Sequence, residues 1–143
     1  MLITQLSIFV ENKFGRLEAI IDGLGKNGIN IRALSIADTA DFGILRIIVD
    51  KPELAKETLK KIGVIAKCSD VIAVPIEDCS GGLAQVLRKL TEKSINVEYM
   101  YAFLGRQAGK AYMVMKADRC EEAEAVLAEL GIEKTDSNDL FSL

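Results

Sequence analysis

Residues 11–31 read ENKFGRLEAIIDGLGKNGINI, and residues 77–97 repeat this stretch as EDCSGGLAQVLRKLTEKSINV. At this offset of 66 residues the matches are identical or apolar: Glu11 with Glu77, Gly15 with Gly81, Leu17 with Leu83, Ile20 with Val86, Leu24 with Leu90, Ile29 with Ile95 and Asn30 with Asn96. Further along, the offset becomes 68 residues and carries Asp50 to Asp118 and Gly63 to Gly131. A repeat of this length predicts two copies of one small fold.

Each copy shows the hydrophobic periodicity of a strand, a helix, two strands, a second helix and a final strand. The opening strands alternate apolar and other residues, and the first helices keep apolar residues at helical spacing. The expected later strands are 31–39, 43–49 and 64–68 in the first copy, and 97–104, 111–117 and 132–135 in the second. The two extra residues of the second copy fall near a predicted hairpin loop at 105–110.

The order β-α-β-β-α-β, met twice, predicts an α+β protein of two ferredoxin-like domains, at residues 1–69 and 70–143. A domain of about 70 residues has a small core of its own, so we expect the two to pack together as a pseudo-dimer.

Helix boundaries carry their own signals. Gly28 is expected to end the first helix, with Ser94 in the same place in the second copy. The second helices are expected to start at Asp50 and Asp118, each three residues before a Glu, with the Asp side chain capping free N–H groups. Pro52 suits the first turn of its helix.

Composition excludes several function classes. The chain has 18 basic and 21 acidic residues, so it has no positive field that would favour nucleic acid. His is absent and the three Cys residues form no CxxC pair, so we expect no metal and no cofactor. Unpaired cysteines suit a reducing compartment, and no secretion signal or apolar run of about 18 residues occurs. The sequence therefore predicts a cytoplasmic protein that does not span a membrane.

Three further patterns are weak as evidence of catalysis or nucleotide binding. Residues 23–28 fit GxGxxG, but they end a predicted helix, whereas a dinucleotide site opens one. Cys79 precedes a helix, yet the acidic Glu77 and Asp78 oppose a thiolate, and no His can serve as its base. Carboxylates recur at Glu11 and Glu77, where repetition at equivalent strand ends favours binding over acid–base work. We expect no enzymatic activity.

The segments VENKFGRLEAI (10–20) with GINI (28–31), and PIEDCSGGLAQVLRKL (75–90) with SINVEYMY (94–101), resemble the ACT domain family. That family's signature is a strand, a turn often written Pro-Gly-x-Leu, a helix and a Gly-x-Asn-Ile-like start of the next strand. Both copies depart from it by lacking the turn proline, with Phe14 and Ser80 before the Gly.

The resemblance implies a regulatory module that binds a free amino acid where paired domains meet. Amides at the two helix N-termini can receive the ligand carboxylate, and Asn or Asp side chains can accept from its ammonium group. The candidate residues are Asn12, Phe14, Gly15, Arg16, Leu17, Asn30, Asp78, Cys79, Ser80, Gly81, Gly82, Leu83 and Asn96. The alternative interpretation is structural: each Gly forms a simple turn, and each Asn stabilises a loop through its own backbone.

The copies differ most in one strand, where Tyr99, Tyr101 and Phe103 replace the small residues at 33, 35 and 37. Alternation puts the three aromatic residues on one sheet face. They can fill the core, wall a ligand pocket or fill a seam between domains or subunits.

Together these observations predict a non-catalytic amino-acid sensor of amino-acid metabolism, forming a homodimer because its apolar content is high. The second hypothesis is a regulatory subunit of a multi-chain enzyme such as acetolactate synthase, with an enzyme of amino-acid metabolism as its partner.

Overall fold

The computed structural model describes residues 2–38, 40–105, 109–132 and 140–141. Two compact units are present, the first unit of Thr4–Ser69 and the second unit of Asp70–Leu143 with Met1–Ile3. In chain order the first unit contains β1 (Leu2–Glu11) from Thr4 onward, α1 (Arg16–Lys26), β2 (Ile31–Asp38), β3 (Phe42–Val49), α2 (Pro52–Lys61) and the start of β4 (Ala66–Glu77). The second continues with β4, α3 (Gly82–Glu92), β5 (Val97–Ala102), β6 (Lys110–Ala117) and α4 (Cys120–Glu129).

The strands of each unit pair antiparallel around a central strand. In the first unit β3 lies between β2 and β1, with Leu6 opposite Ile47 and Ile8 opposite Leu45. In the second unit β6 lies between β4 and β5, with Ile72 opposite Met115. The predicted α+β class and the repeated ferredoxin-like order of elements are confirmed.

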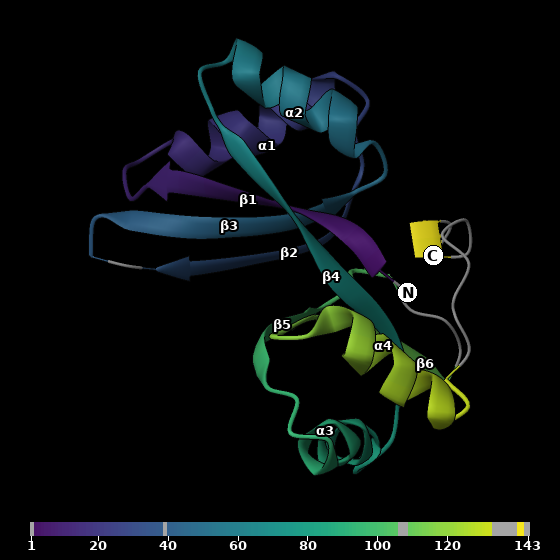
Figure 1. The fold of residues 1–143 in the computed structure, drawn as a ribbon. Helices are drawn as coiled ribbons and strands as arrows, with labels where there is room; N and C mark the ends of the chain where they lie inside the picture. The colour runs from purple at the N-terminus through teal and green to yellow at the C-terminus, as the bar shows by residue number, and fades with distance from the viewer. Residues whose placement is uncertain (1, 39, 106–108, 133–139, 142–143) are drawn as a thin grey trace. The chain divides into compact units, whose positions relative to one another are not determined.

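The two helices of each unit lie side by side on one face of its sheet (Figure 1). Alternate strand residues and one stripe of each helix therefore form a core in each unit. In the first unit the core includes Leu6, Ile8, Val10, Ile20, Leu24, Leu45, Ile47 and Leu59. In the second unit it includes Ile72, Val74, Ile76, Val86, Leu90, Met115 and Leu127. Most of the equivalent apolar positions that define the repeat are thus buried, whereas Leu17 and Leu83 are exposed.

The expected boundary between two strands near residue 69 is wrong. The sequence predicts a last strand at 64–68 and a new one around Ile72, whereas a single strand, β4, runs from Ala66 to Glu77. A continuous strand needs no turn residue between its halves, and the KCSD segment at 67–70 contains neither Gly nor Pro. The matching last strand expected at 132–135 falls largely outside the described residues, and Ile132 itself is not in a strand.

The expected Asp caps of the second helices are also wrong. The residues at the cap positions are Lys51 and Arg119, and neither helix has a side-chain cap hydrogen bond. The Asp50 and Asp118 carboxylates instead accept hydrogen bonds from the backbone N–H groups of Asn30 and Asn96, in the loop before β2 or β5. Pro52 does occupy the first helical turn, as expected.

The predicted ends of the first helices are confirmed. After α1, Gly28 takes φ 70°, and its amide donates to the Gly25 carbonyl at 3.1 Å. Ser94 holds the same place after α3 with φ 56°, and it is the non-glycine residue with positive φ in the described chain. A serine there is strained, which shows that the turn geometry is imposed by the fold. The glycine-rich stretch at 23–28 is therefore a helix end.

The remaining loops agree with the predicted hairpins to within a few residues. Thr39 and residues 106–108, part of the expected loop at 105–110, lie outside the described residues. Beyond the end of β5, the Phe103 amide still donates to the Tyr112 carbonyl at 2.9 Å. Within the described chain, none of the helices is both long and apolar enough to cross a membrane.

Candidate functional site

The turn between β1 and α1 is tightly bonded through its backbone. The Lys13 amide donates to the Glu11 carbonyl at 2.8 Å, and the Arg16 amide donates to the Lys13 carbonyl at 3.3 Å. Gly15, just before the helix, takes φ 80° and ψ −5°. A left-handed conformation of this kind strongly favours glycine, which explains why this position is Gly in both copies.

The turn between β4 and α3 repeats this geometry. The Cys79 amide donates to the Glu77 carbonyl at 2.9 Å, and the Gly82 amide donates to the Cys79 carbonyl at 3.1 Å. Gly81 takes φ 87° and ψ −6°. The similarity of the two turns shows that the sequence repeat is also a repeat of local backbone structure.

Both turns leave backbone donors at a helix N-terminus. The first helical bond of α1 runs from the Ala19 amide to the Gly15 carbonyl at 3.1 Å, so the Leu17 amide has no carbonyl one turn back. In α3 the equivalent bond runs from the Gln85 amide to the Gly81 carbonyl at 3.0 Å. The Leu83 amide therefore also lacks a helical carbonyl as acceptor. Such donors, at the positive end of a helix, can bind a carboxylate.

The structure brings most of the predicted site residues together, in two groups. The first turn contains Asn12, Phe14, Gly15, Arg16 and Leu17, and the second contains Asp78, Cys79, Ser80, Gly81, Gly82 and Leu83. Most of these residues are exposed, whereas Gly82 is buried. Each group comes from a short stretch of chain, which is why the sequence pattern could identify it.

Asn30 and Asn96 do not lie with these groups. Each follows the C-terminal end of α1 or α3, and an 11-residue helix is about 16 Å long. A single amino acid held at one of the turns cannot also reach the Asn at the far end of the same helix.

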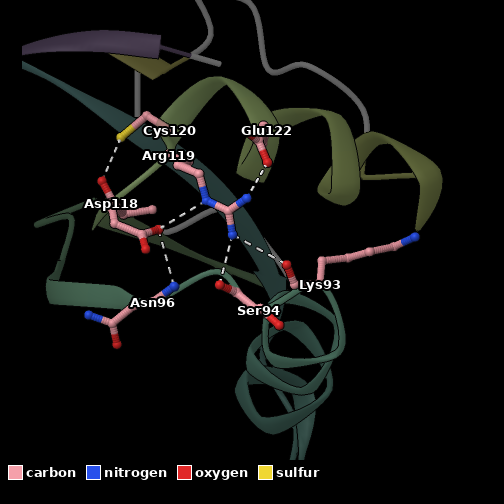
Figure 2. A network of polar contacts seen from close by, with 8 residues as sticks. Lys93, Ser94, Asn96, Asp118, Arg119, Cys120 and Glu122 are labelled. Atoms are coloured by element: carbon pink, nitrogen blue, oxygen red, sulfur yellow. Dashed lines mark hydrogen bonds and ion pairs between the residues drawn. The ribbon is translucent and has the colours of Figure 1, made fainter.

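The two Asn residues have a structural contact instead, which Figure 2 shows for the second copy. The backbone N–H of Asn96 donates to the Asp118 carboxylate at 3.2 Å, and the backbone N–H of Asp118 donates to the backbone carbonyl of Asn96 at 3.0 Å. The first copy repeats both bonds between Asn30 and Asp50, at 2.9 and 3.1 Å. These reciprocal bonds hold the loop before β2 or β5 to the start of the next helix.

A basic residue beside each Asp strengthens the same corner of the fold. In Figure 2 the Arg119 guanidinium donates to the Ser94 carbonyl at 2.7 Å and pairs with Glu122 at 2.6 Å. In the first unit Lys51 donates to the Gly28 carbonyl at 3.0 Å. Lys51 and Arg119 thus donate hydrogen bonds to backbone carbonyls at the C-terminal end of a helix, where the helix dipole is negative. The roles of Lys51 and Arg119 were not predicted from the sequence, although each of them directly follows the Asp that binds the loop.

The side-chain contact of Cys79 is with an acidic residue. Its Sγ donates to the Glu77 carboxylate at 3.9 Å. The sequence contains no His that could serve as the base of a Cys nucleophile.

The first unit also contains a cavity of about 600 Å³, which we call the first-unit cavity. Its walls come from β1, the start of α1 and the segment after α2. They are Ser7, Phe9, Val10, Glu11, Arg16, Ala19, Ile20, Ile62, Gly63, Val64, Ile65 and Lys67. Of the candidate residues named from the turn motifs, Arg16 lines it, and so does Glu11, whose recurrence at a strand end favoured binding. The lining residues at 62–67 were not predicted, because they approach Arg16 only through the fold.

Charged side chains around the turn between β1 and α1 interact with one another. Lys13 pairs with Glu11 at 3.0 Å, and Arg16 lies 4.0 Å from the same carboxylate. The hydrogen bond from Lys13, with the charges of Lys13 and Arg16, holds the pKa of Glu11 below its ordinary value. Glu11 is therefore ionised at neutral pH and presents a negative charge beside two cations.

A smaller hollow of about 360 Å³ lies on the other side of this turn. Asn12 and Leu17 line it, together with Ile36 and Asp38 of β2. Two predicted site residues thus face a space that a small ligand group can occupy.

The aromatic side chains at 99, 101 and 103, in β5 and just after it, differ in burial. Tyr101 and Phe103 are buried, and Phe103 packs edge-to-face on Tyr112 with ring centroids 6.3 Å apart. This contact is a favourable arrangement for aromatic pairs and accounts for their size at these positions. Burial fits the core interpretation, but neither residue belongs to the core cluster that the second unit forms with α3 and α4, so a seam between domains or subunits stays open.

Comparison with known proteins places this fold and these turns in a family. A family model described as an ACT domain pair matches residues 1–143. The chain belongs to the ACT domain pair family. The match covers the whole of the sequence, so both ferredoxin-like copies are ACT units, as the turn motifs predicted.

Two solved structures illustrate the likeness. Protein BT0572 from Bacteroides thetaiotaomicron is 37% identical, with a TM-score of 0.92, and the match covers 100% of this chain and 98% of that one. The ligand-free regulatory subunit of aspartate kinase from Thermus thermophilus is 17% identical, with a TM-score of 0.67 and 90% of each chain covered. At 17% identity the second likeness concerns the ACT pair fold alone. No curated protein matches the chain.

Proposed function

We propose that this ACT domain pair is a non-catalytic regulatory module that binds a free amino acid. The observation that carries the proposal is the repeated turn, in which a left-handed glycine leaves helix N–H donors open to a carboxylate. Asn12 and Asp78, at the ends of the preceding strands, supply acceptors for an ammonium group. The location of the ligand where paired domains meet, which the resemblance implies, stays a prediction.

Regulation would follow from binding by a shift in conformational population. A ligand changes an equilibrium only as far as it binds one conformation more tightly than another. Turns at helix N-termini suit this role, because a bound carboxylate there can change how the helix packs against its neighbours or a partner protein. The partner we expect is an enzyme of amino-acid metabolism.

A thermal-shift screen of the purified protein against the twenty amino acids tests the proposal. A ligand at about 100 times its Kd stabilises the folded state by about 2.7 kcal/mol, so a selective rise in Tm is expected. Gly15→Val should remove or weaken that rise. Gly131→Val is the matched control, because Gly131 also has positive φ and open space but lies outside the turns. A flat screen contradicts amino-acid binding.

A regulatory subunit that works only with a catalytic chain is the second candidate. Two structures with this fold are regulatory subunits of aspartate kinase, from Thermus thermophilus and Thermus flavus. Co-purification of the protein with a larger catalytic chain, without any effect of amino acids on its Tm, would favour this candidate. In either case we expect a homodimer, since several large apolar side chains are exposed, Ile36, Phe42 and Ile65 among them.

A further inference from the structure

The first-unit cavity has the size and lining of a small-molecule site. At about 600 Å³ it lies within the range of ligand pockets, roughly 300–1,000 Å³. Most of its walls are apolar, and its charged lining groups are Glu11, Arg16 and Lys67. A few charged groups in an apolar cleft are what orient a small ligand.

The charges of the cavity complement a zwitterion. The Glu11 carboxylate can accept from an ammonium group, and Arg16 and Lys67 can bind a carboxylate. The Arg16 side chain is 59% exposed, so its donors remain accessible beside Glu11. An α-amino acid carries both charges on one carbon and can meet both signs within a single cavity.

The apolar walls favour a large apolar side chain on that amino acid. Phe9 is 71% exposed, Ile62 49% and Ile65 86%, which is unusual exposure for residues of this size. All three line the cavity. A branched aliphatic or aromatic side chain would remove part of this surface from water, which is the main driving force for apolar ligands.

The second unit lacks the groups that this recognition needs. Arg16 corresponds to Gly82, and a Cβ placed on Gly82 would overlap the Glu77 carbonyl oxygen. The backbone therefore leaves no space for a side chain where the first unit has its guanidinium. At the repeat offset of 68, Lys67 corresponds to Thr135, so the second cation is also missing from the sequence.

We infer that the amino acid is bound in the first unit alone and that it is one with a large apolar side chain. This inference rests on the proposed function and names the unit and the class of ligand. It assigns the two charged groups of the amino acid to side chains of the first-unit cavity in place of the turn amides and Asn12. Glu11 holds the ammonium group, Arg16 and Lys67 hold the carboxylate, and Phe9 and Ile65 cover the side chain.

Isothermal titration with L-leucine and L-phenylalanine tests the inference. One of them should bind with one site per chain, at least tenfold tighter than L-glutamate or L-lysine. Two truncated probes, 4-methylpentanoate and 3-methylbutylamine, lack the ammonium and the carboxylate of leucine, respectively. Each should bind at least tenfold more weakly than leucine if leucine is the preferred ligand, because each leaves one charge of the cavity unmatched.

Variants assign the binding to this cavity. Arg16→Gln and Lys67→Gln should each weaken binding at least tenfold while keeping the urea midpoint of the parent protein. Arg88→Gln, which removes an exposed cation from α3, is the control and should bind as the parent does.

Four results would overturn the inference while leaving amino-acid binding intact. They are two sites per chain, preference for a charged amino acid, affinity unchanged in both cavity variants, and loss of binding only in Gly81→Val. Absence of binding by every amino acid would overturn the inference and the proposed function together.

Discussion

Replacing Gly82 by Ala should destabilise the protein through a single backbone contact. Gly82 is buried at the first position of α3, and a Cβ there would meet the Glu77 carbonyl oxygen and lie 3.4 Å from the Ile76 side chain. Its φ is not positive, so backbone conformation alone would not penalise Ala. The carbonyl belongs to the main chain, and the contact cannot be relieved by rotating a side chain.

The magnitude follows from two opposing effects. Overpacking of a tight site costs typically about 1–3 kcal/mol, and a backbone neighbour puts Gly82 near the upper end. Replacing Gly by Ala in a helix gains about 0.5–1 kcal/mol, mainly from the lower entropy of the unfolded chain. The net loss should be about 2 kcal/mol. With a urea m-value of about 2 kcal/mol/M, the midpoint should fall by about 1 M.

Urea denaturation followed by far-UV circular dichroism measures this loss, and Gly25→Ala is the matched control. Gly25 lies exposed in α1 with no atom within 4 Å of a built Cβ, so Ala there should stabilise by about 0.5–1 kcal/mol. The two substitutions should therefore move the midpoint in opposite directions. A Gly82→Ala protein as stable as the parent would refute the close approach of α3 to Glu77, and with it the reason why the second unit cannot carry a side chain there.

The remaining predictions concern the loop bonds and the charged turn. Asp118→Ala, and likewise Asp50→Ala, should cost about 1 kcal/mol in urea unfolding because each removes an acceptor from a loop amide. Asp22→Ala, which breaks only an exposed pair on α1, should stay within about 0.5 kcal/mol; equal losses in all three variants would contradict a special role for the loop bonds. A carbon-detected NMR titration should find the pKa of Glu11 below the ordinary value of a glutamate, and Lys13→Met should raise it towards that value. Since the folded-state pKa is lowered, the stability contribution of Glu11 is present above its unfolded pKa and is lost as pH falls through the folded pKa. A Glu11 pKa that does not respond to Lys13→Met would show that the pair is absent in solution.

Part of the candidate site was predictable because it is encoded by consecutive residues. The turns around Gly15 and Gly81 could be found from the repeat, since a positive φ before a helix restricts the residue type locally. The end of α1 at Gly28 was predictable for the same reason, because a positive φ after a helix also favours glycine. The same reasoning from neighbouring residues failed for Asp50 and Asp118. A helix begins close to each of them, but each carboxylate bonds a backbone N–H that lies 20 or 22 positions earlier in the chain and caps no helix.

The sequence by itself determined the two ACT copies, their element order and most of their core, because hydrophobic periodicity and turn chemistry are properties of neighbouring residues. Only the tertiary structure decided that β4 runs unbroken, that Asn30 lies far from Gly15, and that Ile65 and Lys67 reach Arg16 to form a cavity. These features depend on which distant segments meet, and a contact between residues some fifty positions apart leaves no periodic signal in the chain.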